Sequence, residues 1–184
     1  MKALQIVDHG QVAIREVETP TIKVEEALIR ITAAALNRRD HWIRAGKYPD
    51  IQFNSTLGSD GCGVVEAVGS SEHQHWTGKT VLINPNVNWG DNPECQAPGY
   101  QVLGMPTDGT LAEYIAVPVH RLVEKPAHLT DSEAAALPLA GLTAFRAVFN
   151  RGALQQGQKV LVTGIGGGVS QMLFLWARAA GASV

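Results

Sequence analysis

The stretch from Lys159 to Val184 constrains the fold most, because it joins a short apolar run, a glycine-rich turn and an apolar segment of helical length. The run Val160 to Val162 lies between glycines, which is typical of a buried parallel strand. The turn at Gly164 to Gly168 leads into a segment that favours a helix, and Gly181 to Val184 resembles the start of a second strand. This order predicts the first βα unit of a doubly wound sheet.

The glycine-rich turn predicts a dinucleotide site. Glycines let backbone N–H groups approach a pyrophosphate, and the helix N-terminus behind them favours negative charge. The strict G-x-G-x-x-G pattern begun at Gly164 fails, since Val169 replaces its last glycine, but Gly164, Gly167 and Ser170 fit a looser spacing. A tight strand-to-helix connection without a ligand is the alternative. We assign cofactor binding to Gly164, Gly166, Gly167, Gly168 and Val169.

The second strand has only begun at Val184, so the residue that would select NAD or NADP is not part of this sequence. The apolar run Met172 to Trp176 needs neighbours, because exposure to water would forfeit about 1.5–3 kcal/mol for each side chain. We therefore expect this chain to be the N-terminal part of a longer protein, or to depend on a partner.

Composition excludes several classes of function. The net charge is −2 and the basic residues are scattered, which argues against a nucleic-acid surface. The N-terminus has no signal-peptide pattern, and no apolar stretch approaches the ~20 residues that span a bilayer. We expect a cytoplasmic protein without a membrane partner, in which Cys62 and Cys95 are free thiols.

The first part of the chain has the pattern of short strands separated by Gly, Pro and Asn, which favours a small β-barrel or sandwich. The expected strands are Ala3 to Val7, Val12 to Val17, Ala27 to Ala33, Gly63 to Val68, Val81 to Ile83 and Leu111 to Val117. Near residue 125 the pattern becomes helical, with a capping box at Thr130 and Glu133 and with Pro138 between two helices. We place the domain boundary there, giving domains of residues 1–125 and 126–184.

A short helix is expected after the third strand. Asn37 is a good N-cap, Asp40 stands at the N3 position, and Gly46 favours a left-handed stop. A helix N-terminus at the edge of a barrel also suits an active-site side chain.

Metal sites are not expected. The long segment between Ile83 and Leu111, a functional lobe or the remnant of one, has Cys95 as its only soft ligand and no His. His73 and His75 are assigned to the surface, because among carboxylates and cysteines only Glu72 is close in sequence.

Five segments in this order resemble the medium-chain dehydrogenase/reductase superfamily: Ala35 to Pro49, Gly58 to Gly69, Asp108 to Pro118, Glu133 to Ala147 and the VTGIGGGVS turn. The resemblance implies a mixed fold, namely a GroES-like β-barrel catalytic domain, bridging helices, and the first βα unit of a Rossmann domain. It also implies a small-molecule substrate and, in the full-length form, a homodimer.

The resemblance also bears on zinc. Zinc alcohol dehydrogenases of this superfamily carry Cys, His and a third ligand, usually Cys, where this chain has Asn37, Ser59 and Leu139. None of these replacements offers a thiolate or an imidazole. The chain is similar to the zinc-free branch of quinone oxidoreductases and enone reductases.

By this resemblance Asn37 orients a substrate carbonyl, Trp42 walls the pocket and Thr143 packs beside the nicotinamide. We assign Asp40, with Asn37 and Thr143, to the catalytic site and Asp60, with Trp42, to the substrate pocket. Helix capping or support of neighbouring groups is the alternative for both aspartates, and no general acid is identifiable. We expect an NAD(P)H-dependent reductase of quinones or α,β-unsaturated carbonyls, with NADP(H) favoured over NAD(H) and without zinc. The alternatives are a zinc-type alcohol dehydrogenase relative, and a truncated or non-catalytic chain that serves as a binding partner.

Overall fold

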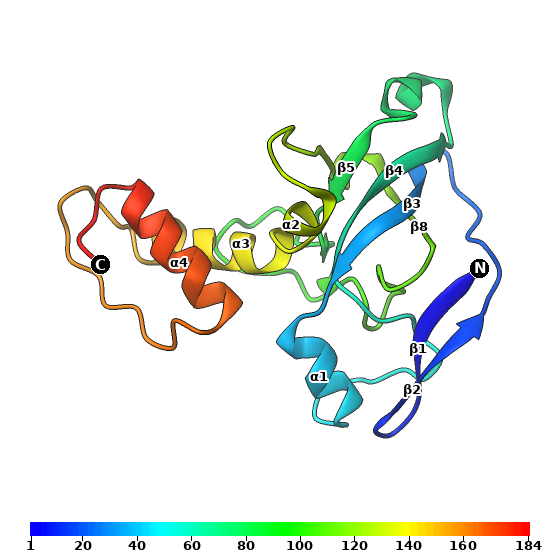
Figure 1. Cartoon of the computed structure of the whole chain (residues 1–184), viewed down its shortest axis with the longest axis horizontal. Coiled ribbons are helices and arrows are strands. Elements are labelled where there is room, and N and C mark those ends of the chain that lie inside the picture. Colours follow the sequence, from blue (N-terminus) through cyan, green and yellow to red (C-terminus); the bar gives the residue numbers. More distant parts are fainter. The chain divides into compact units, whose positions relative to one another are not determined.

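The computed structural model describes residues 1–184, which form two compact units, Met1–Ala136 and Leu137–Val184 (Figure 1). The division lies after Ala136, whereas the sequence pattern changes near residue 125. The reason is that helix α2 (Asp131–Ala135) packs within the first unit. Its Ala134 and Ala135 are buried in one cluster with Cys62 and Leu82.

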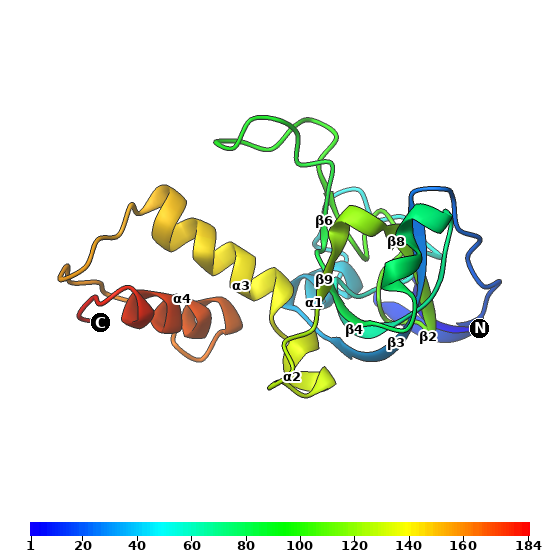
Figure 2. The same cartoon turned by 90° about the horizontal axis from the view of Figure 1, so that it is seen from above.

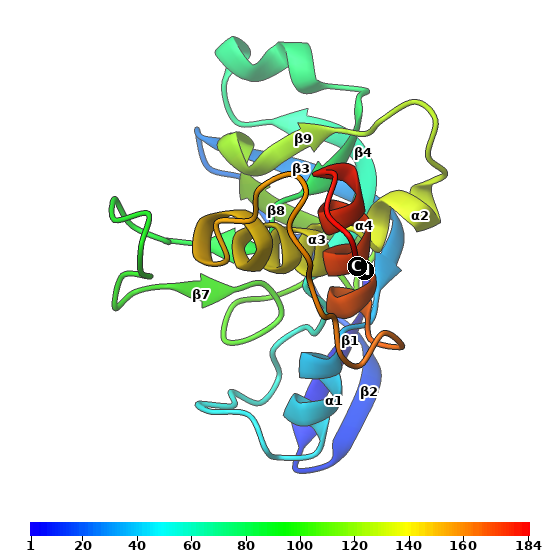
Figure 3. The same cartoon turned by 90° about the vertical axis from the view of Figure 1, so that its left-hand side faces the viewer.

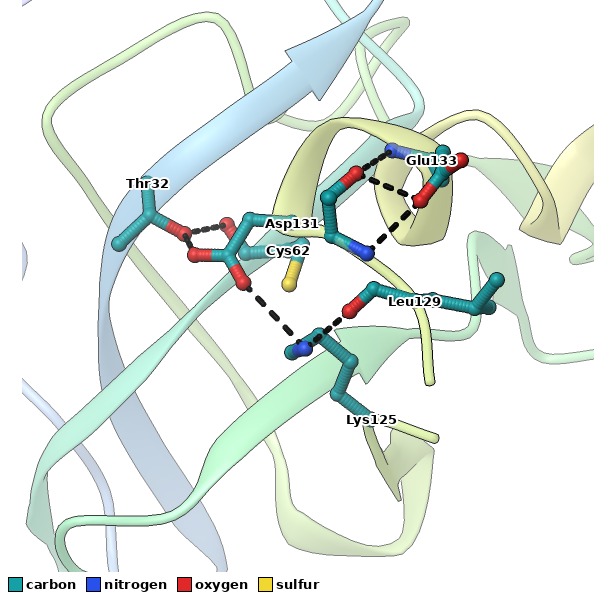
Figure 4. A network of polar contacts seen from close by, with 7 residues as sticks. Thr32, Cys62, Lys125, Leu129, Asp131 and Glu133 are labelled. Carbon is teal, nitrogen blue, oxygen red and sulfur yellow. Dashed lines mark hydrogen bonds and ion pairs between the residues drawn. The ribbon is translucent and has the colours of Figure 1, made fainter. Parts of the chain in front are cut away.

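Polar contacts also fasten α2 to the first unit (Figure 4). The Thr32 hydroxyl donates to the Asp131 carboxylate at 2.7 Å, and the Lys125 ammonium lies 3.6 Å from the same carboxylate. The helix begins as predicted, because the Thr130 hydroxyl accepts from the Glu133 N–H and the Glu133 carboxylate accepts from the Thr130 N–H.

The first unit is built on an antiparallel sheet of five strands, with two small hairpins beside it. In spatial order the sheet contains β8 (Tyr114–Pro118), β3 (Glu26–Ala35), β4 (Asp60–Val68), β5 (Thr80–Ile83) and β9 (Leu122–Glu124). The hairpins are β1 (Lys2–Asp8) with β2 (Gln11–Glu16), and β6 (Asn86–Val87) with β7 (Gln101–Val102). All six predicted strands are present, although their first and last residues differ from the predicted ones. Strands β6, β7 and β9 were not predicted, because two or three residues are too few to show a periodic pattern.

Strand β3 carries the alternation expected of a half-buried strand. Ala27 and Ile29 are fully buried, while Arg30 and Thr32 are exposed. The buried side joins the main core, which contains Val65, Val81, Ile83, Leu103, Ile115, Val117, Val119 and Leu122. The first unit therefore has one main apolar core against its sheet and two smaller apolar clusters.

Three glycines bring two loops into backbone contact near the start of β4. A Cβ atom on Gly109 would lie 1.9 Å from the Gly58 carbonyl oxygen, and one on Gly104 would lie 2.7 Å from the same atom. Gly104 also has a positive φ of 91°. The loop that contains Gly104 and Gly109 therefore rests directly on Gly58.

Two 3₁₀ turns complete the first unit, η1 (Ser71–Trp76) and η2 (Val119–Arg121). His73 and His75 lie on η1, where the His73 ring is 3.1 Å from the Glu25 carboxylate. No group of three or more His, Cys, Asp or Glu side chains is arranged to hold a metal ion.

The second unit consists mainly of two helical stretches that lie side by side (Figure 2). The first is α3 (Pro138–Phe145), continued by the π-helical turn η3 (Arg146–Arg151), and the second is α4 (Gly168–Ala179). Pro138 starts α3, because its missing N–H costs nothing in the first helical turn. The ring of Trp176 packs edge-on against Phe145 at 5.4 Å, and its Nε1 donates to the Gly141 carbonyl at 3.3 Å.

The buried strand predicted at Val160 to Val162 is not formed. The segment makes one parallel bridge, between Lys159 and Ser183, and Leu161 is 89% exposed. A buried parallel strand requires neighbours on both edges and a helix on each face, and the bridge to Ser183 is the one strand contact within the chain. The order of turn and helix that follows is as predicted. None of the helices has the length and apolar character needed to cross a membrane.

Candidate active site

The candidate site in the first unit begins where helix α1 (Arg38–Arg44) leaves β3. Asn37 is extended, with φ −117° and ψ 159°, and its N–H donates to the Asp40 carboxylate at 2.7 Å. The other oxygen of Asp40 accepts from the Gly58 N–H at 3.3 Å. Gly46 follows the helix with φ 69°, so the predicted start and stop are both confirmed.

The side chain of Asn37 reaches across to β4. Its Nδ2 donates to Oδ2 of Asp60 at 2.8 Å, and Asp60 is 1% exposed. This contact fixes the orientation of the amide, since a carboxylate can only accept from the NH₂ end. The Asn37 side chain also takes part in a capping box with Asp40, and the second N–H of its amide has no hydrogen bond in the chain. Asn37 and Asp60, far apart in sequence, are thus brought together.

Burial changes the acidity of Asp40. Loss of solvent raises the pKa of its carboxyl above 3.8, while the N–H groups of Asn37 and Gly58 and the charge of Arg39 pull it down. The N–H contacts identify Asp40 as the residue that holds Asn37 and the Gly58 loop in place.

Arg39 organises the other side of α1. One guanidinium nitrogen donates to the Ser59 hydroxyl at 2.8 Å and to the Leu103 carbonyl at 2.6 Å. The second donates to the Tyr48 hydroxyl at 3.1 Å and to the Met105 carbonyl at 3.2 Å. The sequence analysis missed this role, because its partners lie on three separate loops. The sequence offered one signal for this role of Arg39, namely that two arginines in succession follow the N-cap residue Asn37.

Helix α1 lies beside the β1–β2 hairpin (Figure 3). A cavity of about 270 Å³ beside Asn37 is lined by residues of both elements. Its wall is largely apolar and consists of Leu4, Val12, Leu36, Asn37, Asp40, His41, Arg44 and Leu57. Trp42 is not part of this wall. It is 40% exposed and lies 5.8 Å from the cations of both Arg38 and Lys47. Asp60 is not part of this wall either, and it contacts the Asn37 amide through the hydrogen bond described above.

The donor set at the zinc-ligand positions does not fit zinc. The Asn37 amide nitrogen is bonded to Asp60, and the Ser59 hydroxyl donates to Leu103 and accepts from Arg39. The guanidinium of Arg39 lies 2.8 Å from the Ser59 oxygen, so a dication at this point would meet a fixed positive charge. Leu139 has no donor atom in its side chain.

The candidate cofactor residues of the second unit lie on α3 and around the start of α4. Thr143 is exposed on α3, and the residues from Gly164 to Val169 are all exposed. Gly164 has φ 66°, and the Ser170 hydroxyl donates to the Thr163 carbonyl at 3.0 Å, which closes the turn. Gly167 and Gly168 form the N-terminus of α4. The Gly167 N–H donates to the Gly164 carbonyl at 2.9 Å, whereas the N–H groups of residues 168–170 have no backbone acceptor and favour an anion.

Known proteins match the chain over nearly its whole length. The model of the alcohol dehydrogenase GroES-like domain matches residues 23–127. A zinc-type alcohol dehydrogenase-like protein of Leptosphaeria maculans is 35% identical over 178 residues, covering 91% of this chain and 50% of that protein. A 2-methylene-furan-3-one reductase of Solanum lycopersicum is 36% identical over 97% of this chain and 44% of its own length.

Solved structures of alcohol dehydrogenases also resemble the chain. The crystal structure of an NAD-dependent alcohol dehydrogenase superposes with a TM-score of 0.89 at 35% identity, over 99% of this chain and 56% of that one. The chain thus spans about half the length of the proteins it matches.

Proposed function

The chain belongs to the medium-chain dehydrogenase/reductase superfamily, and from this premise we propose that its protein uses NAD(P)H to reduce quinones or α,β-unsaturated carbonyls without catalytic zinc. One observation carries the proposal. The positions that would hold zinc are occupied by a neutral amide and a neutral hydroxyl, both already hydrogen-bonded within the protein. In this proposal the substrate carbonyl is polarised by a hydrogen bond from the protein and not by a metal ion.

The Asn37 amide is the group that acts on the substrate. Asp60 takes one of its N–H groups, which leaves the second free for a carbonyl oxygen in the cavity beside α1. A donor held in advance at the oxygen that gains negative charge stabilises the transition state more than a mobile one does. The apolar wall excludes water from the reacting atoms, while Asp40 positions the backbone of Asn37.

The nicotinamide cofactor supplies the hydride when it is bound. We assign its pyrophosphate to the turn from Gly164 to Gly168 with Val169, where N–H groups at the start of α4 attract an anion. Thr143 is proposed to contact the nicotinamide. NADP(H) is proposed as the preferred cofactor over NAD(H). A cytoplasmic location and a homodimer are further parts of this proposal.

The proposal is tested with the protein that carries this chain, using NADPH and NADH in turn and 1,4-benzoquinone or a simple enone as acceptor. We expect Asn37→Ala to lower kcat/KM about 10²-fold, because one transition-state hydrogen bond is lost. Asn150→Ala, which changes an exposed asparagine of η3, is the matched control and should leave kcat/KM unchanged. Unchanged turnover in Asn37→Ala, or stoichiometric zinc in metal analysis of the active protein, would contradict the proposal.

A further inference from the structure

A second and larger cavity, of about 620 Å³, lies in the first unit. It is bounded by β8, by the segments around Lys23 and Asp108, and by Arg121, and it includes neither Asn37 nor Asp60. Cavities that bind small molecules commonly have volumes of about 300–1,000 Å³. The cavity is therefore large enough for a metabolite, and the proposed reaction does not use it.

Arg121 is the unusual residue of this cavity. It is 5% exposed, and its Nε and one terminal nitrogen both donate to the Asn84 carbonyl, at 3.0 and 2.6 Å. No carboxylate pairs with it. Burial lowers its pKa to about 10, so the guanidinium is still charged at neutral pH. Buried charges are normally paired, because an isolated one is costly.

Other polar residues also line the cavity. Tyr114 and Lys23 are among them, together with three carboxylate residues. Two of the carboxylates in the wall are already engaged: Asp108 accepts from the Thr56 N–H at 2.7 Å, and Glu26 from the Lys23 N–H at 2.9 Å. The third, Glu18, is exposed. The wall therefore holds carboxylates as well as cations, and Arg121 is the buried cation that has no carboxylate partner.

We propose that this cavity binds a small oxyanion, a carboxylate or a phosphate, with Arg121 as its counter-ion. The guanidinium can supply N–H groups that Asn84 does not use, in the geometry that suits carboxylate and phosphate oxygens. The neighbouring apolar core, which includes Leu103 and Ile115, favours a ligand that carries an apolar part as well.

The test uses the protein that carries this chain, with inorganic phosphate and acetate as separate probes and chloride at equal ionic strength as the salt control. We expect a saturable rise in melting temperature and a matching calorimetric binding curve for at least one probe, and the stronger probe identifies the headgroup. Arg121→Gln should weaken this binding at least tenfold. Lys159→Gln, which removes an exposed charge in the second unit, should leave it unchanged.

A measurement on the unaltered chain guards against misfolding of the variant. The Arg121 Nε resonance should shift during the titration with the same dissociation constant as the calorimetry. The proposal is overturned if neither anion binds saturably, if the Arg121 resonance stays fixed during binding, or if a folded Arg121→Gln variant binds as tightly as the original chain.

Discussion

Two threonines of one loop differ in what their hydroxyl groups contact. The Thr110 hydroxyl donates to the Asp60 carbonyl at 2.7 Å, whereas the Thr107 hydroxyl is buried without any hydrogen-bond partner. An unpaired buried hydroxyl costs about 1–3 kcal/mol, while a formed bond contributes about 1 kcal/mol. The two residues therefore affect stability in opposite directions.

We expect Thr107→Val to raise the free energy of unfolding by about 1 kcal/mol, and Thr110→Val to lower it by a similar amount, since valine has nearly the shape of threonine. Urea denaturation followed by circular dichroism measures both changes. The two variants serve as controls for each other. A loss of stability in Thr107→Val would show that its hydroxyl has a partner in solution.

The carboxyl of Asp40 should make stability depend on pH. Because burial raises its folded-state pKa above 3.8, the folded chain binds the proton more tightly than the unfolded chain does. Its contribution to stability is therefore greatest below pH 3.8 and falls as the pH rises through the raised pKa. Titration of the Asp40 carboxyl carbon by NMR checks the sign, and a midpoint at or below 3.8 would contradict it. In Asp40→Asn this part of the pH dependence should vanish.

At the scale of single elements, the start of α2 is the clearest local signal. Its capping box joins Thr130 and Glu133, and such caps are worth about 0.5–2 kcal/mol. We expect Thr130→Ala to lower the free energy of unfolding by about 1 kcal/mol in urea. Ser132→Ala, at an exposed position of the same helix, should change it by less than about half as much. Equal effects would mean that the cap does not support α2.

Local signals explain which elements could be predicted from the sequence. The caps at Asn37 and Thr130 and the stop at Gly46 depend on residues within one or two turns, and all three are present. The alternation in β3 likewise needs only its own residues. Val160 to Val162 differs, because the burial of this segment depends on neighbouring strands, and its one strand contact in the chain is the bridge between Lys159 and Ser183.

The candidate site could be predicted in part for the same reason. Asn37 was found through its helix and through a family resemblance, but its hydrogen bond to Asp60 joins residues of different elements. Arg39 and Arg121 were missed, since each binds carbonyls that no local pattern connects to it. The sequence shows which side chains carry a functional group. Their hydrogen-bond partners lie far away in sequence and become known only from the folded structure.

At the scale of the whole molecule, the two units differ in how firmly their backbones are held. Strand β3 is bonded on both edges, to β4 and β8, whereas residues 161–166 donate no backbone hydrogen bond. We expect amide hydrogen exchange within seconds at residues 161–166 and protection by several orders of magnitude in the centre of β3. Mass spectrometry of exchanged peptides measures both. Strong protection of residues 161–166 would show that this segment acquires a partner in solution.

The contact of Gly104 and Gly109 with Gly58 also limits how this protein can be altered. None of the three carries a chemical function, yet a methyl group on Gly109 would have to occupy the space of a carbonyl oxygen only 1.9 Å away. A complete mutational scan should therefore find position 109 as intolerant as any active-site residue. Engineering of the loop should therefore vary Thr107 and keep Gly109 unchanged.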